Sequence, residues 1–167
     1  MYLNNILNIY LNNNSRMNFI MNKELFDYNY LYLMDPVANN VIDNGVFHRF
    51  IYSNSYLTLN SLIFKLKMKN VRLIKLFNKY KISFDIFDEN NAKQCEYITK
   101  LEKNILCKFN ISEKCVYNIL DNINNDNIRV YSGKTLPDTL PEVDIYFKIS
   151  GIWIHENRHG VTFKFSL

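Results

Sequence analysis

The most recognisable chemical pattern in this chain is the pentad from His155 to His159, whose letters H-E-N-R-H match the H-E-x-x-H pattern of zinc hydrolases. In that pattern two histidines one helical turn apart bind zinc, and the glutamate polarises a zinc-bound water. Here the pentad lies between two runs of alternating apolar residues, and Gly160 follows it directly. We therefore expect a hairpin turn with neither metal nor cofactor. A zinc hydrolase using His155, Glu156 and His159 remains an alternative.

A second short motif, S-G-K-T at residues 132–135, is similar to the end of a phosphate-binding loop. The first glycine of that loop would fall at Ile128, and Pro137 follows where backbone amides at a helix start are needed. The chain has no nucleophile elbow, no glycine-rich dinucleotide turn and no carboxylate cluster of the polymerase or nuclease type. The sequence therefore predicts a protein that is not an enzyme and has no catalytic residues.

The strongest pattern lies between Asn44 and Phe84, where eight lysines and arginines occur without any acidic residue. The formal net charge of the whole chain is only +4, so positive charge is concentrated in this block. Aromatic residues alternate with the cations, and a basic surface with flat rings is suited to single-stranded nucleic acid, because cations neutralise phosphates and rings stack on bases. Equally, the rings could form the core while the lysines face solvent.

Length and composition favour one folded, intracellular domain. The chain has 167 residues, of which 48% are hydrophobic and 15% aromatic, which is enough for a core. Three cysteines without C-x-x-C spacing indicate free thiols in a reducing compartment, which is the host nucleus or cytoplasm if the protein is viral. No apolar run has the length of a membrane span, so we expect no membrane partner.

The first 22 residues differ from the rest, with no acidic residue, one arginine and many asparagines. We expect a flexible leader over residues 1–22 and a single β-rich domain over residues 23–167.

In the first half of that domain, alternation predicts strands over residues 46–52 and 56–69. In the second of these strands Leu62, Phe64 and Leu66 share one face, and Lys65, Lys67 and Lys69 the other. Residues 71–80 change to helical spacing and predict a short basic helix, with a strand pair as the competing interpretation. Residues 81–87 then return to strand.

In the second half, the clearest helix is expected from Asp88 or Asn90 to about Cys107, and Ser112 could begin another. A short strand over 128–131 and an extended loop over 133–141 follow. Two strands, 143–154 and 161–167, are joined by the turn 155–160. Trp153 shares the apolar face of the first of these strands and is assigned to the core.

These elements predict a mainly β protein with one or two helices, in the α+β class. A Greek-key barrel of the oligonucleotide-binding (OB) type fits the order, because a helix commonly separates its third and fourth strands. An open antiparallel sheet packed on helices is the alternative.

The two final strands also carry a resemblance. Residues 145–153 (IYFKISGIW) and 160–165 (GVTFKF) resemble a terminal strand pair in small single-stranded DNA-binding-like proteins of arthropod DNA viruses and virus-derived mobile elements. The two segments together cover 15 of the 167 residues. It implies a viral DNA replication accessory protein and brings no catalytic residues with it.

Together these observations predict a non-enzymatic protein that binds single-stranded DNA or RNA, with homo-oligomerisation left open. The residues expected to bind phosphates or bases are Arg49, Tyr52, Tyr56, Lys65, Lys67, Lys69, Tyr146, Lys148 and Lys164. The alternative from another class is a structural or interaction protein of a virion or ribonucleoprotein that docks through a basic patch.

Overall fold

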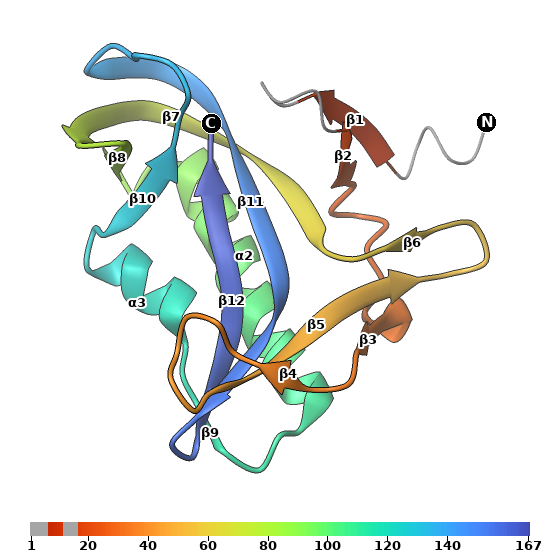
Figure 1. Cartoon of the computed structure of the whole chain (residues 1–167). Coiled ribbons are helices and arrows are strands. Elements are labelled where there is room, and N and C mark those ends of the chain that lie inside the picture. The colour runs from red at the N-terminus through yellow and green to blue at the C-terminus, as the bar shows by residue number, and fades with distance from the viewer. Residues whose placement is uncertain (1–6, 12–16) are drawn as a thin grey trace. The chain divides into compact units, whose positions relative to one another are not determined.

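A computed structural model describes residues 7–11 and 17–167 (Figure 1). It is 47% strand and 21% helix, which confirms the prediction of a mainly β, α+β fold. Strand pairs are both parallel and antiparallel, so the sheet is mixed and not purely antiparallel. Contacts divide the chain into two compact units. The first comprises Met1–Phe64, Asn104–Val116 and Lys148–Phe163, and the second Lys65–Lys103, Tyr117–Phe147 and Lys164–Leu167.

In the first unit, strand reaches back into the segment predicted as a flexible leader. Strand β1 (Leu7–Leu11) pairs antiparallel with β2 (Met17–Met21), and Ile20 of β2 pairs in parallel with Ile63 of β7 (Leu62–Leu76). Residues 1–6 and 12–16 of that segment lie outside the described residues.

Strand β5 (Val46–Ser53) is the centre of the first unit. It pairs antiparallel with β3 (Leu31–Leu33), β4 (Val37–Ala38) and β6 (Thr58–Leu59), and with the final residues of β11 (Thr139–His155). A short 3-10 helix, η1 (Tyr28–Tyr30), precedes β3. Strand β9 (Lys114–Cys115) pairs in parallel with the start of β12 (Arg158–Ser166). Phe50 of β5 is buried and stacks on Phe109 at 6.0 Å between ring centroids.

The second unit contains neighbouring strands and two helices. Strand β7 pairs antiparallel with β8 (Lys79–Ser83), β8 with β10 (Ile128–Tyr131), and β10 in parallel with β12 (Figure 1). Helix α2 (Glu89–Phe109) buries Cys95, Ile98 and Leu101, which have helical spacing. Helix α3 (Asn118–Asn124) is shorter. The strands contribute buried side chains in alternation, including Leu66, Met68, Ile82, Val130, Phe147 and Phe165.

Residues 71–80 form a strand pair, so the predicted basic helix is wrong and its competing interpretation is confirmed. Strand β7 continues to Leu76, and Phe77 turns the chain with a φ of 53° before β8 begins at Lys79. Asn70, with a φ of 52°, adds one exposed residue to the strand. Because such a bulge shifts the alternation by one residue, Val71 and Leu73 are again buried after it.

Other boundaries also differ from prediction. Ser112 begins no helix, since α3 starts only at Asn118 and Tyr117 at its N-cap makes no side-chain capping bond. The amides of Ile119 and Leu120 instead donate to the buried carboxylate of Glu102 at 3.0 to 3.2 Å. The predicted loop over residues 133–141 already becomes strand β11 at Thr139.

The predicted hairpin is confirmed, but its turn is shorter than the expected residues 155–160, because β11 ends at His155 and β12 begins at Arg158. Glu156 and Asn157 form its turn with φ values of 47° and 59°, the left-handed conformation expected of both residues in a type I′ turn. The core position assigned to Trp153 is wrong, because Gly151 and Ile152 are both buried and interrupt the alternation. Trp153 is consequently only half-buried.

Candidate nucleic-acid interface

The nine residues predicted to bind nucleic acid are divided between the two units. Arg49, Tyr52, Tyr56 and Lys148 belong to the first unit, and Lys65, Lys67, Lys69, Tyr146 and Lys164 to the second.

Tyr52 cannot stack on a base, which corrects one predicted site residue. Its side chain is 1% exposed, and its ring lies 5.6 Å from Phe26 and 6.2 Å from Tyr30 between centroids. Burial raises the pKa of its phenol. Tyr56, by contrast, is 62% exposed in a loop whose amides donate to the side chain of Asn54. Of these two tyrosines, only Tyr56 presents a ring to solvent.

The lysines of β7 are exposed as the alternation predicts, but two of them are neutralised. Lys65 forms an ion pair with Asp144 at 2.9 Å, and Lys67 with Glu142 at 2.8 Å. The hydrogen bond to Glu142 raises the pKa of Lys67. These carboxylates come from β11, outside the acid-free block of the sequence. The predicted lysine ladder therefore carries less positive charge than its sequence indicates.

A stronger cationic surface lies on β8, β10 and β12 of the second unit. Tyr131 of β10 is 36% exposed, with the ammonium groups of Lys79 and Lys164 at 4.7 and 4.1 Å from its ring centroid. Such distances are within the range of cation–π attraction. The register explains the grouping, because Tyr131 pairs directly with Lys79 and with Ser166, two residues after Lys164. We call the surface formed by Arg72, Lys79, Lys81, Arg129, Tyr131 and Lys164 the basic aromatic face.

The remaining cations of this face follow from the same register. Lys81 pairs with Arg129 and with Ile74, and Arg72 pairs with Ser83. Directly opposite residues share a face of a sheet, so these side chains lie on the side of Tyr131. Asp126 forms an ion pair with Lys81 at 3.3 Å. Within the described residues, no other carboxylate forms an ion pair with a cation of this face. The face therefore has a net positive charge.

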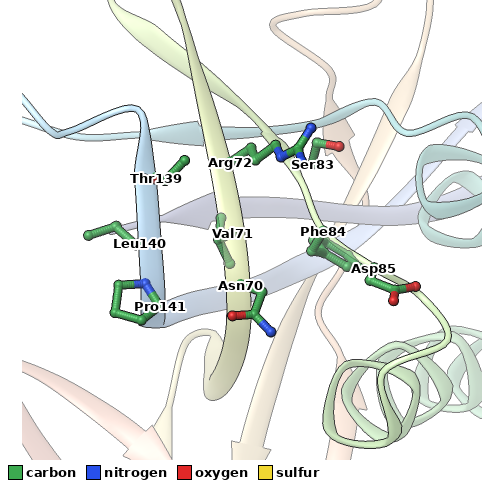
Figure 2. Close-up of a pocket in the computed structure, with 9 residues that line it drawn as sticks. All are labelled: Asn70, Val71, Arg72, Ser83, Phe84, Asp85, Thr139, Leu140 and Pro141. Carbon is green, nitrogen blue, oxygen red and sulfur yellow. The ribbon is translucent and has the colours of Figure 1, made fainter.

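A hollow of about 690 Å³ adjoins this face at Arg72. It is lined by residues 70–72 of β7, by Ser83 at the end of β8 with the two residues after it, and by residues 139–141 at the start of β11. Figure 2 shows the Arg72 side chain beside Ser83, with Leu140 and Pro141 on the opposite wall. A guanidinium and a hydroxyl at one wall are donors for an anionic oxygen, whereas the opposite wall is apolar.

Tyr131 and Arg129 were missed by the sequence interpretation, although a signal for them existed. The strand over residues 128–131 alternates, which places Ile128 and Val130 inside and Arg129 and Tyr131 outside. Both lie outside the acid-free block, and Lys79 was assigned to a helix. Their grouping depends on pairing among β8, β10 and β12, which sequence spacing does not reveal.

The H-E-x-x-H pentad does not form the helical arrangement that zinc hydrolases need. His159 is fully buried with its Nε2 at 3.4 Å from Sγ of Cys115, and burial lowers its pKa. The Nε2 of His155 lies 3.8 Å from a carboxylate oxygen of Glu156 in the turn. Within residues 7–11 and 17–167, no three His, Cys, Asp or Glu side chains are grouped as a metal site requires.

Comparisons of the chain with protein-family models, with curated proteins and with solved structures give no match. In the described part of the chain, no helix combines the length and the apolar composition needed to cross a membrane.

Proposed function

We propose that this protein binds single-stranded nucleic acid, without catalysis, through the basic aromatic face. The observation that carries the proposal is the exposed ring of Tyr131 with the ammonium groups of Lys79 and Lys164 over it. An aromatic ring surrounded by cations provides both contacts that a single strand requires, a stacking surface and phosphate neutralisation.

The same geometry suggests how a strand is held. A base that stacks on Tyr131 displaces an ammonium group from the ring, and the displaced lysine is then free to contact a neighbouring phosphate. Stacking on one ring contributes about 1–3 kcal/mol. Arg129, Lys81 and Arg72 continue the cationic surface across neighbouring strands towards the hollow of Figure 2.

Exposed apolar groups favour a single strand over a duplex as the ligand. Ile74 lies opposite Lys81 and is exposed, as is Leu76 opposite Lys79. In a single strand the unstacked bases can contact such side chains, whereas a duplex presents mainly phosphates at its surface. An intracellular role as a DNA replication accessory, of viral or mobile-element origin, is part of this proposal.

The test is fluorescence anisotropy of labelled oligo-dT across a salt series, with duplex of equal length as competitor. We expect Tyr131→Leu to weaken binding roughly tenfold while Tyr131→Phe retains it, because only the ring is needed for stacking. Lys79→Gln and Lys164→Gln should each reduce the slope of log affinity against log salt by about 0.7. Lys93→Gln, on the exposed side of α2, is the matched control and should change neither quantity.

A basic patch that docks on a protein or on folded RNA is the second candidate, and the charge of the same face favours it. In that case duplex and heparin compete as well as oligo-dT, and Tyr131→Leu has no effect beyond that of Tyr131→Phe. This result would remove the stacking mechanism.

A further inference from the structure

A second hollow, of about 480 Å³, lies in the first unit and combines aromatic walls with one cation. Phe47 and Arg49 are two residues apart on β5 and therefore share one face of the strand. Trp153 of β11 pairs directly with Phe47. Phe163 of β12 completes the aromatic lining. Among the described residues that line the hollow, Arg49 alone is ionisable. Its volume is in the range of small-molecule sites.

The far wall of this hollow is the loop that follows β4, and its shape is fixed by its own hydrogen bonds. The side-chain oxygen of Asn39 accepts from the amides of Val41 and Ile42 at 2.9 and 3.1 Å. The amide of Asn39 donates to the carbonyl of Gly45 at 2.9 Å, which closes the loop. Val41 is nevertheless 91% exposed. This wall of the hollow is therefore preformed, as the walls of small-molecule sites usually are.

The position of Trp153 also depends on its neighbours. A Cβ atom added to Gly160 would lie 2.8 Å from the Trp153 ring, so the indole packs directly against the glycine backbone. A Cβ atom added to Gly151 would lie 2.5 Å from the Phe47 ring. These two glycines therefore leave room for both rings close to the strand backbones. One side of the lining consists of aromatic rings that a planar ligand can cover.

Arg49 determines the charge of the ligand. Among the described residues, no carboxylate forms an ion pair with it. A guanidinium beside aromatic rings recognises an anionic group attached to a planar ring, since it binds phosphate or carboxylate in a bidentate manner.

We infer that this hollow binds one nucleotide, with its base against Trp153 and Phe47 and its phosphate on Arg49. The geometry is independent of the basic aromatic face, and only the choice of a nucleotide over other planar anions rests on the proposed function. The nucleotide is either a free mononucleotide or one nucleotide of a bound strand, because both offer the same base and phosphate.

Trp153 is the only tryptophan of the chain, so its intrinsic fluorescence reports on this hollow alone. We would titrate the protein with deoxythymidine monophosphate, with thymidine and with short oligo-dT. We expect saturable quenching of wild type by the monophosphate or by oligo-dT. Thymidine, which has no phosphate, should bind wild type roughly tenfold more weakly. Arg49→Gln should bind the monophosphate or oligo-dT roughly tenfold more weakly than wild type does. Quenching by the monophosphate alone identifies a free nucleotide, and quenching by oligo-dT alone identifies a strand. Arg158→Gln, exposed in the same unit and not lining the hollow, is the control.

The inference is overturned if neither the monophosphate nor oligo-dT quenches Trp153. It is also overturned if Arg49→Gln binds as tightly as wild type and thymidine binds as tightly as the monophosphate. Anisotropy of labelled oligo-dT separates this failure from that of the proposed function. Retained oligo-dT binding with no change at Trp153 rejects the hollow alone. Saturable quenching by the monophosphate together with lost oligo-dT binding supports the hollow and rejects the basic aromatic face.

Discussion

The side chain of Asn91 makes the two hydrogen bonds with Lys69 that a neighbouring strand would make. The amide of Lys69 donates to Oδ1 of Asn91 at 2.8 Å, and Nδ2 of Asn91 donates to the carbonyl of Lys69 at 3.0 Å. The same Nδ2 donates to the carbonyl of Asp85 at 3.0 Å. Asn91 is fully buried, so it ties the first turn of α2 to β7 immediately before the bulge at Asn70.

We therefore expect Asn91→Ala to lower the free energy of unfolding by about 2–4 kcal/mol, because it leaves buried backbone groups without partners. Denaturant unfolding measures this change. Asn90→Ala is the control, since Asn90 is less buried and its side chain makes one main-chain hydrogen bond, to Lys67. This variant should lower the free energy of unfolding by about 1 kcal/mol. Equal losses in the two variants would contradict the role assigned to Asn91.

Glu102 should make stability depend on pH. Burial raises its pKa to about 7 from 4.5, so the folded protein holds a proton that the unfolded chain has released between these values. The contribution of Glu102 is therefore complete below pH 4.5, declines as pH rises to 7, and is constant above that. Between pH 4.5 and 7, the free energy of unfolding should fall by about 3 kcal/mol more in wild type than in Glu102→Gln.

Comparison with Glu102→Gln is needed because His159 acts in the opposite direction. Burial lowers the pKa of His159, so its contribution to stability rises with pH as the unfolded chain loses its proton. Both proteins contain this histidine, and the difference between their unfolding curves removes its effect. Parallel curves from pH 4.5 to 7 would show that folding does not raise the pKa of Glu102.

The sequence predicted the elements whose alternation or helical period continues without interruption. The alternation of β7 from Phe64 to Met68 and the apolar stripe of α2 match the buried residues. Prediction failed after Asn70, because one inserted residue shifts the phase of a strand and makes Leu73, Leu76 and Phe77 fit helical spacing. In the structure Leu76 and Phe77 are exposed, as a helix core would not allow.

The candidate site was predicted less well, and for a different physical reason. Charge density along the sequence identified Lys65 and Lys67 but not the carboxylates that pair with them from β11. Likewise, Tyr131 obtains its cations from Lys79 and Lys164, which are 52 and 33 residues away in the sequence. Such contacts depend on which strands are neighbours, and no local pattern encodes this.

Gly151 and Gly160 should tolerate alanine to different degrees. A Cβ at Gly151 would lie 2.2 Å from the carbonyl oxygen of His48, which is fixed in β5. At Gly160 the obstacle is the Trp153 ring, a side chain that can rotate. Gly151→Ala should therefore unfold the protein or destabilise it by more than about 3 kcal/mol, and Gly160→Ala by about 1–3 kcal/mol.

The two glycine variants also differ in a spectroscopic signal. Gly160→Ala should shift the emission of Trp153, because the indole must leave the strand surface. Thermal unfolding and intrinsic fluorescence check both expectations. Unchanged emission together with unchanged stability in Gly160→Ala would show that the ring does not pack on that glycine.

The ion pairs of β7 limit how much its lysines can contribute to nucleic-acid binding. Lys65 and Lys67 are neutralised by Asp144 and Glu142, so Lys65→Gln and Lys67→Gln should weaken oligo-dT binding by less than Lys79→Gln or Lys164→Gln.

The double variant Glu142→Gln with Asp144→Asn releases both ammonium groups while nearly preserving side-chain shape. It should bind oligo-dT more tightly and increase the salt dependence by about 0.7 for each additional phosphate contact. Because the side chains of these ion pairs are exposed to solvent, each pair contributes little to stability, and the variant should stay folded. Unchanged affinity and salt slope in a folded double variant would place the bound strand away from Lys65 and Lys67, with the phosphates held by the basic aromatic face alone.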